Sequence, residues 1–232
     1  MSVPGDHTPS GFRLGSLGGT TIHLEGTFLI LMGLFVILDI ERGRPLQNAL
    51  LWIPILLISV LFHEIGHAAL IGLFGFGRSA IVLGGFGGVT INRRTAVPWK
   101  EIVISLAGPA FSVLLSLILI AASRMVPLIR TDPMLQVLVP LMIFVNFVWA
   151  VFNLVPVYPL DGGQALQNLM RAFLTERRSA FLSIWISLIL GVTLAVLTLL
   201  AGEFFIAIVA AMLSMQNFQR WQLYRRMVGG ND

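Results

Sequence analysis

Three side chains suited to metal chemistry lie within five residues of one apolar segment. His63 and His67 are four residues apart, and Glu64 directly follows the first histidine. Because a helix brings positions i and i+4 onto one face, both imidazoles can bind a single metal ion. Glu64 lies about 100° around the helix, where it can act as a general base without binding the metal. The pattern predicts a hydrolytic zinc site, and the alternative is a group of buried polar residues that pair with one another.

The surroundings of this motif favour the functional interpretation. Residues 49–74 otherwise consist mostly of apolar side chains, as expected for a membrane span. An ionisable group near the centre of a bilayer costs about 2.5–3.5 kcal/mol, so three such groups in five positions need a strong reason.

The composition indicates an integral membrane protein. Of the 232 residues, 56% are hydrophobic and 11% are charged, and the mean hydropathy is +0.89. Soluble domains contain about 25% charged residues. The sequence contains no cysteine, so a metal must be held by His, Asp or Glu. The formal net charge is only +4 and the basic residues lie at the ends of apolar segments, so we expect no nucleic-acid partner.

Six apolar segments approach the length of about 20 residues that a helix needs to cross a bilayer. They are residues 24–40, 49–74, 102–123, 135–157, 180–201 and 204–219. The fold expected is an all-α membrane protein, in which a six-helix transmembrane bundle forms a single domain over residues 1–232. The sixth segment is the weakest, because its purely apolar part runs only from Phe204 to Met215.

The basic residues predict how these spans are oriented. If the N-terminus is cytosolic, four basic residues fall outside, namely Arg42, Arg44, Arg124 and Arg130. The other 11 of the 15 fall inside: Arg13, Arg78, Arg93, Arg94, Lys100, Arg171, Arg177, Arg178, Arg220, Arg225 and Arg226. Because cytosolic loops are enriched in Lys and Arg, we expect a multi-pass cell-membrane protein with both termini and the histidine pair toward the cytosol.

A glycine-rich segment separates the second and third spans. Gly84–Gly88 lies between strand-forming residues, which predicts a small β hairpin or strand at the membrane after the second helix. In the functional interpretation, Gly85, Phe86 and Gly87 belong to an edge strand that pairs with an extended substrate peptide. A flexible loop explains the spacing equally well.

A catalytic zinc usually has three protein ligands, and Asp161 is the best candidate for the third. It follows the fourth span, after Pro156 and Pro159, which end or kink that helix. The alternative is that Asp161 and Gln164 form a capping box for a helix over 165–174. The topology favours the metal, because the second and fourth spans both run from outside to inside.

Two asparagines share one face of the fourth span, and each must find partners in an apolar setting. For Asn146 the sequence favours a hydrogen bond between helices. For Asn153 the alternative is a contact to the backbone of a bound substrate. Gly108-Pro109 in the third span predicts a local kink or close helix packing.

Taken together, these motifs resemble those of the site-2 proteases, a family of intramembrane zinc metalloproteases. The matching residues are His63-Glu64-Ile65-Gly66-His67, the Gly84–Gly88 region, and Asn153 followed by Pro156, Pro159 and Asp161-Gly162-Gly163. The resemblance covers roughly residues 15–220 and is to a minimal form, without inserted PDZ or C-terminal CBS domains.

The resemblance implies one Zn²⁺ per chain, held by His63, His67 and Asp161, with Glu64 as catalytic base and Asn153 as a substrate-binding residue. The implied reaction is hydrolysis of a peptide bond in or near a transmembrane segment of a membrane protein. The implied partners are this substrate and the lipid bilayer, and a homo-oligomer or a regulatory membrane partner is compatible with the sequence.

Two other functions are open. A membrane zinc transporter would need polar ligands at several depths, whereas the ligands here cluster at one level. A catalytically inactive membrane scaffold would retain the motif for stability alone.

Overall fold

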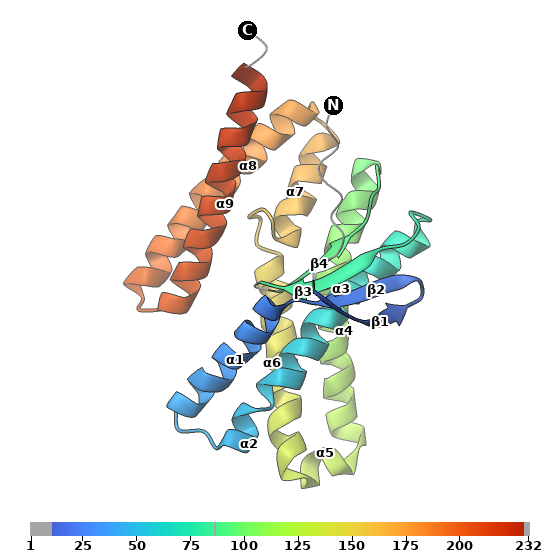
Figure 1. Cartoon of the computed structure of the whole chain (residues 1–232), viewed down its shortest axis with the longest axis vertical. Helices are drawn as coiled ribbons and strands as arrows, with labels where there is room; N and C mark the ends of the chain where they lie inside the picture. Colours follow the sequence, from blue (N-terminus) through green and yellow to red (C-terminus); the bar gives the residue numbers. More distant parts are fainter. Residues whose placement is uncertain (1–10, 86, 230–232) are drawn as a thin grey trace. The chain divides into compact units, whose positions relative to one another are not determined.

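The computed structural model describes residues 11–85 and 87–229. The strands are β1 (Phe12–Leu17), β2 (Thr20–Leu24), β3 (Ala80–Gly84) and β4 (Gly87–Ile91). The helices, shown in Figure 1, are α1 (Gly26–Glu41), α2 (Leu46–Ala49), α3 (Trp52–Leu73), α4 (Pro98–Met125), α5 (Pro127–Thr131), α6 (Pro133–Asn153), α7 (Asp161–Arg171), α8 (Glu176–Leu200) and α9 (Phe204–Gly229).

The chain divides into two compact units, and the boundary runs through two continuous helices. Unit 1 comprises the residues up to Thr95 together with Ala107–Ala150, and unit 2 comprises Ala96–Leu106 and Val151–Asp232. The organisation into a single domain stays a prediction.

Within the part of the chain that the structure describes, four helical segments are long and apolar enough to cross a membrane, which makes this a multi-pass membrane protein. They are Leu46–Leu73, Pro98–Met125, Pro133–Asn153 and Glu176–Leu200, and they correspond to the second to fifth expected spans. Helix α1 has only 16 residues, and the C-terminal half of α9 carries three arginines. The count of six spans therefore stays a prediction.

The β structure is larger than the expected hairpin, because β1 and β2 join β3 and β4 in a four-stranded sheet. The outer pairs are antiparallel and the central β2–β3 pair is parallel. Gly18 and Gly19 form the turn between β1 and β2, and both have positive φ angles, which a tight two-residue hairpin requires. The strands are in the order β1-β2-β3-β4, so β1 and β4 are the edges.

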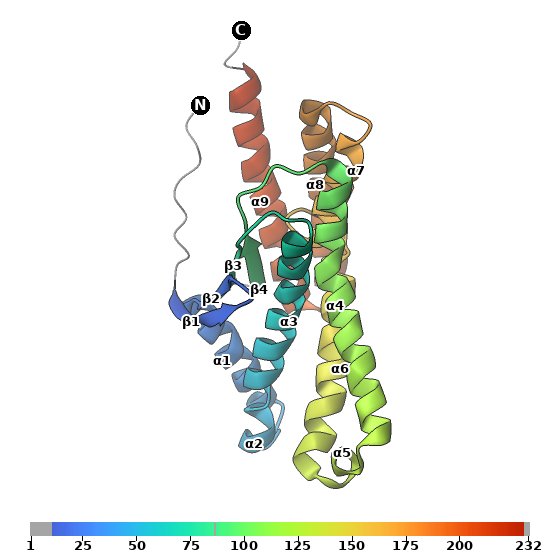
Figure 2. The same cartoon turned by 90° about the vertical axis from the view of Figure 1, so that its right-hand side faces the viewer.

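The register gives the sheet two different faces. In the parallel pair, Leu24 lies beside Leu83 and Ile22 beside Ile81, so these four side chains share one face. Ile81 and Leu83 are buried in a core cluster with residues of α1 and α3, and Leu24 packs against it. Figure 2 shows the sheet beside α3. Burial of these apolar side chains holds the sheet against the helix that carries the histidines.

The helices of unit 1 pack through apolar side chains and through buried polar contacts. The part of α4 in this unit, α5 and the first part of α6 form a helical hairpin (Figure 2). Asn146 of α6 donates from Nδ2 to the Ser59 hydroxyl of α3 at 2.8 Å, and both side chains are fully buried. The predicted hydrogen bond between helices at Asn146 is thus confirmed.

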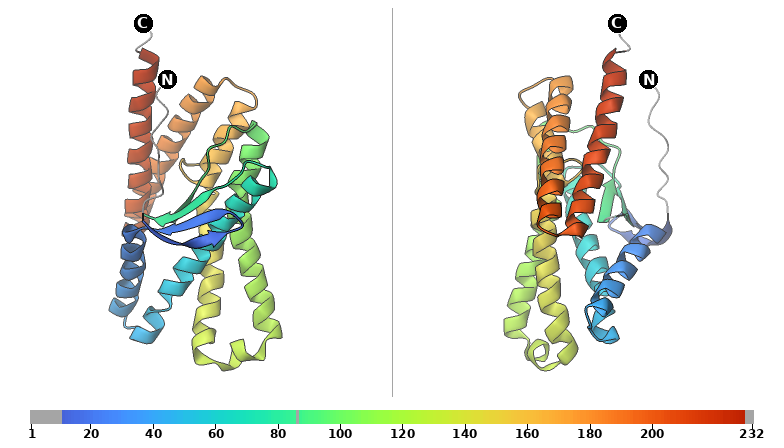
Figure 3. Two further views of the ribbon diagram at one scale, coloured as in Figure 1. Left: turned by 45° about the vertical axis from the view of Figure 1, so that its right-hand side comes forward. Right: turned by 90° about the vertical axis from the view of Figure 1, so that its left-hand side faces the viewer.

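In unit 2, α8 and α9 lie side by side (Figure 3) and hold the segment after α6 in place. The Tyr158 N–H donates to the Ser187 hydroxyl of α8 at 2.9 Å, and the Tyr158 carbonyl accepts a bond from Asn217 of α9. Helix α6 ends at Asn153, whereas the expected span continued to 157. The difference arises because Pro156 disfavours helical backbone at the residue before it.

Candidate metal centre

Helix α3 places the two histidines one turn apart on a buried face. Their Nε2 atoms are 3.3 Å apart, and both side chains are buried. Two zinc–nitrogen bonds of about 2.0–2.1 Å at a tetrahedral angle separate the nitrogens by about 3.3–3.4 Å. The pair therefore has the spacing of two ligands to one tetrahedral zinc, and the residues present fit this metal.

A serine of the neighbouring helix orients His63. Nδ1 of His63 lies 3.1 Å from the hydroxyl oxygen of Ser112 in α4, and Ser112 is fully buried. When Nδ1 carries the proton and donates it to this oxygen, the lone pair of Nε2 is directed toward the shared ligand position. The ring of Trp149 lies edge-on to His63 with centroids 6.5 Å apart, which further limits rotation of the imidazole.

Two glycines let α4 approach α3 at the level of the histidines. A Cβ atom on Gly108 would lie 2.3 Å from Nε2 of His67 and 2.6 Å from Nε2 of His63. A Cβ atom on Gly66 would lie 2.6 Å from the carbonyl oxygen of Ala107. The close packing predicted at Gly108-Pro109 is confirmed, and the missing side chain of Gly108 leaves space beside the two Nε2 atoms.

The carboxylate of Glu64 is held by the sheet. The Thr90 hydroxyl of β4 donates to Glu64 Oε2 at 2.7 Å and lies 3.2 Å from the Glu64 carbonyl oxygen. A Cβ atom on Gly88 would lie 2.5 Å from Glu64 Cγ, so only glycine leaves room for this side chain. The face of β4 that carries Gly88 and Thr90 thus fixes the position of the candidate base.

Asp161 belongs to unit 2, where it is buried at the first residue of α7. The capping-box alternative is wrong, because Leu160 rather than Asp161 occupies the capping position. The Gln164 side chain donates instead to the carbonyl oxygen of Pro159 at 2.9 Å. Gly162 permits close backbone packing, because its Cβ atom would lie 2.1 Å from the carbonyl oxygen of Leu154.

The predicted substrate-binding residues lie in both units. Asn153 is the last residue of α6 and is mostly buried. Gly85 occupies the turn between β3 and β4 with a positive φ angle, and a Cβ atom on Gly87 would meet the Trp149 ring at 2.8 Å. Phe86 lies outside the described residues.

Comparison with known proteins identifies the family. Residues 28–160, more than half of the chain, match the family model described as Peptidase M50B-like, and residues 129–200 match the Peptidase family M50 model. The chain belongs to the site-2 protease family.

Individual relatives agree with this assignment. Zinc metalloprotease MJ0392 of Methanocaldococcus jannaschii is 29% identical over 208 residues, which cover 88% of this chain and 57% of the relative. Stage IV sporulation protein FB of Bacillus subtilis is 35% identical over 113 residues, which cover 48% of this chain and 37% of the relative. This site-2 protease chain spans about half the length of the curated relatives that it matches.

A solved structure shares the fold. The site-2 protease from Methanocaldococcus jannaschii superimposes with a TM-score of 0.66 at 24% sequence identity, over 91% of this chain and 95% of that one.

Sequence reasoning missed Thr90 and Ser112, which contact the site, and did not place Gly88 or Gly108 beside it. Two of them had a usable signal. Gly108 and Ser112 are four residues apart in an apolar span, so a helix places them on one face, where small and polar residues mark a close contact. Thr90 had no such signal, because the register of β4 against α3 is set by tertiary packing.

The space beside the histidines yields a first prediction. Gly108→Ala should lower zinc affinity at least about tenfold, because the new methyl group must displace a ligand imidazole. Zinc per purified chain, measured by elemental mass spectrometry during chelator titration, checks this. Gly72→Ala is the matched control, because a Cβ atom at this glycine of α3 meets nothing within 4 Å. Wild-type zinc retention by Gly108→Ala would contradict the proposed role of this glycine.

Proposed function

We propose that this chain is an intramembrane zinc metalloprotease that hydrolyses a peptide bond in or near a transmembrane segment of a membrane-protein substrate. The observation that carries the proposal is the 3.3 Å separation of the His63 and His67 Nε2 atoms, next to a carboxylate held by Thr90. Membership in the site-2 protease family and the similarity to zinc metalloproteases support it.

The third ligand in this proposal is Asp161, so that one zinc ion per chain is held by two imidazoles and a carboxylate. Its support is chemical. Asp161 is buried, and a buried carboxylate needs a cation or hydrogen-bond donors to remain ionised. The chain has no cysteine to compete as a ligand. Two imidazoles and a carboxylate are a known ligand set of catalytic zinc.

Glu64 is the proposed general base. It accepts a proton from the attacking water and delivers it to the leaving amine as the peptide bond breaks. Bound zinc would supply Lewis-acid polarisation of the scissile carbonyl and make a water acidic enough to lose a proton near neutral pH. The Thr90 hydroxyl donates to Oε2 and so orients the carboxylate, which leaves Oε1 for the water.

The substrate is proposed to bind as an extended strand. A helical substrate hides its carbonyl groups in hydrogen bonds, so it must unwind before hydrolysis. Strand β4 is an edge of the sheet, and pairing along Gly87–Ile91 would replace the backbone bonds that the substrate loses. The turn at Gly85 is proposed to contribute to this binding strand, and the contribution of Phe86 stays a prediction from the sequence. The Asn153 amide is proposed to bond the substrate backbone.

The proposed setting is a cell membrane with six spans, in which both termini and the site are directed toward the cytosol. The distribution of basic residues supports this orientation, and water would then reach the site from the cytosolic side. A homo-oligomer or a regulatory membrane partner remains compatible with this setting.

The mechanism is tested directly by Glu64→Gln. Loss of the base should slow cleavage by about 10²–10⁴-fold while one zinc per chain is retained. The measurement is single-turnover cleavage, in proteoliposomes, of a transmembrane peptide that the wild type cleaves. Glu41→Gln, at an exposed glutamate that ends α1, is the matched control. Undiminished turnover with zinc bound would exclude Glu64 as the base.

The third ligand is tested by metal content. Asp161→Ala should reduce bound zinc well below one per chain, because two imidazoles alone bind zinc weakly and reversibly. Asp39→Ala is the control, since Asp39 is also buried and lies in α1 beside Arg44. Full zinc occupancy in the Asp161 variant would require another ligand, even if activity were lost.

The positioning of Glu64 is tested by Thr90→Val, which keeps the shape of the side chain and removes the hydroxyl. Loss of a hydrogen bond to a charged group should lower kcat about tenfold or more and leave KM and zinc content nearly unchanged. Thr90→Ser should restore most of the rate. Equal loss in both variants would contradict this role of the hydroxyl, because the serine variant retains it.

A further inference from the structure

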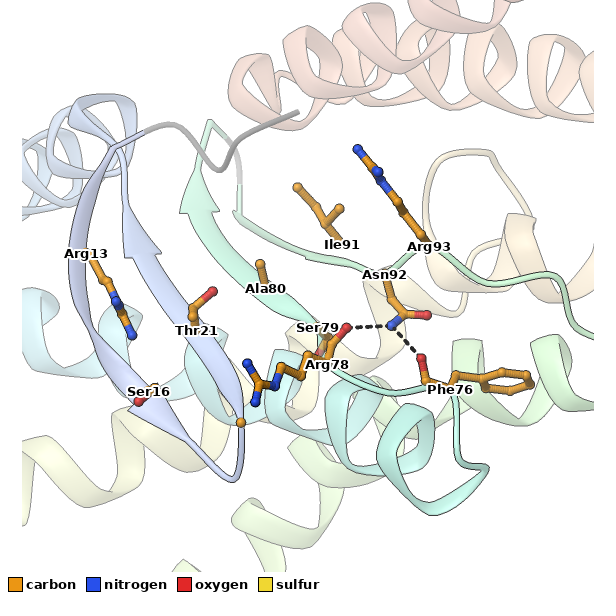
Figure 4. A pocket seen from close by; sticks show the side chains of 11 residues that line it. Arg13, Ser16, Thr21, Phe76, Arg78, Ser79, Ala80, Ile91, Asn92 and Arg93 are labelled. Carbon is orange, nitrogen blue, oxygen red and sulfur yellow. Dashed lines mark hydrogen bonds between the residues drawn. The ribbon is translucent and has the colours of Figure 1, made fainter. Parts of the chain in front are cut away.

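The sheet carries a second, basic site on the face opposite Glu64. A hollow of about 580 Å³ is lined by Arg13, Ser16, Gly19, Thr21, Phe76, Arg78, Ser79, Ala80, Ile91, Asn92 and Arg93 (Figure 4). Three of these eleven described residues are arginines and none is acidic. All of them belong to unit 1.

The strand register explains why the hollow is separate from the metal centre. Arg13 pairs with His23, Ser16 with Thr21, and Thr21 with Ala80, so Arg13, Ser16, Thr21 and Ala80 share one face. Gly88 and Thr90 pair with Leu83 and Ile81 on the other face, where Glu64 lies. One sheet thus separates two sites of different chemistry.

Two of the arginines converge on this face. Figure 4 shows Arg13 of β1 and Arg78, which precedes β3, extending toward one another across β2 near Thr21, while Arg93 extends away from them. The stem of Arg78 lies over the turn between β1 and β2, since a Cβ atom on Gly19 would be 3.8 Å from Arg78 Cγ. Neither guanidinium has an acidic partner among the residues that line the hollow. Together with the Thr21 hydroxyl, the pair offers forked donors of the kind that bind phosphate oxygens.

The surroundings of Arg13 and Arg78 indicate what kind of phosphate compound would bind there. Arg78 lies five residues after the end of α3, which belongs to a candidate membrane span, so the hollow lies near a membrane surface. Strand β1 also exposes large apolar side chains: Phe12 is 76% exposed, Leu14 53% and Leu17 58%. The register places Phe12 and Leu17 on the face of the strand opposite Arg13, so β1 is basic on one face and apolar on the other. An edge strand with exposed apolar residues and an arginine suits the boundary between acyl chains and headgroups.

We propose that this hollow binds the phosphate of an anionic lipid headgroup, with Arg13 and Arg78 as the binding side chains and β1 in contact with the acyl region. A freely diffusing phosphate would bind the arginines without contacting the exposed apolar side chains of β1, whereas a lipid would contact both. The site is independent of the proposed proteolysis, since lipid binding is measured without a substrate.

The test titrates the detergent-solubilised full chain with dioleoyl phosphatidylglycerol and measures the lipid-bound fraction by native mass spectrometry. Arg13→Gln and Arg78→Gln should each weaken binding about fivefold, and the double variant about 25-fold. Dioleoyl phosphatidylcholine should bind more weakly and depend less on these arginines. The control is Arg177→Gln with Arg226→Gln, which removes the same charge from exposed arginines also expected on the cytosolic side. It should change binding less than twofold.

A second variant keeps the test decisive if the double variant does not fold, as judged by circular dichroism. Thr21→Glu retains both arginines and places a carboxylate between them, so it should also abolish preferential binding of the anionic lipid. Equal losses in the control variant, or full binding in the double and Thr21 variants, would show that the arginines only set topology and would overturn the proposal. Arginine-dependent binding of inorganic phosphate alone, with displacement of the lipid, would overturn the lipid source. Displacement of the lipid by a micromolar acidic peptide would assign the hollow to a protein segment and overturn it as well.

Discussion

The close approach of α3 and α4 is the contact on which the chemistry of this molecule depends. At Gly66 and Gly108 the two helices come so near that a single added methyl group would collide with backbone or with a histidine nitrogen. This proximity brings Ser112 within hydrogen-bond distance of His63 and leaves room beside both Nε2 atoms. Burying an imidazole without a hydrogen-bond partner in an apolar environment costs free energy. The packing of α3 against α4 gives His63 such a partner in Ser112, so it lowers the cost of burying this imidazole.

The sheet adds a second level of organisation to this helical frame. One face contributes Thr90 and Gly88 to the environment of Glu64, and the opposite face carries the arginine-lined hollow. Because the alternation of side chains along a strand is strict, a shift of register by one residue would exchange these faces. The apolar cluster around Ile81 and Leu83 resists such a shift, since it would move both side chains out of the core.

Local patterns predicted the parts of this molecule that depend on short sequence spacing. The histidine pair, the second to fifth apolar spans and the strand character around the central glycines all follow from helical periodicity, hydropathy or backbone restrictions. The sheet as a whole did not follow, because β1 and β2 are short and gain their stability from pairing with β3 far along the chain. Thr90 and Ser112 were missed for a related reason. Each is an ordinary residue in its own segment and acquires its role only through the element packed opposite to it.

The parallel pairing of β2 with β3 also imposes an order of assembly. Residues 25–79, which include α1 and α3, separate the two strands along the chain, so the hairpin of β1 and β2 lacks its central partner until both helices have been synthesised. Strand β4 emerges later still, and only then can Thr90 reach Glu64. During synthesis the histidine pair therefore enters its helix before the carboxylate beside it is held in place. A newly made chain completes the surroundings of Glu64 at a late step, after the helix that carries the histidines has been made.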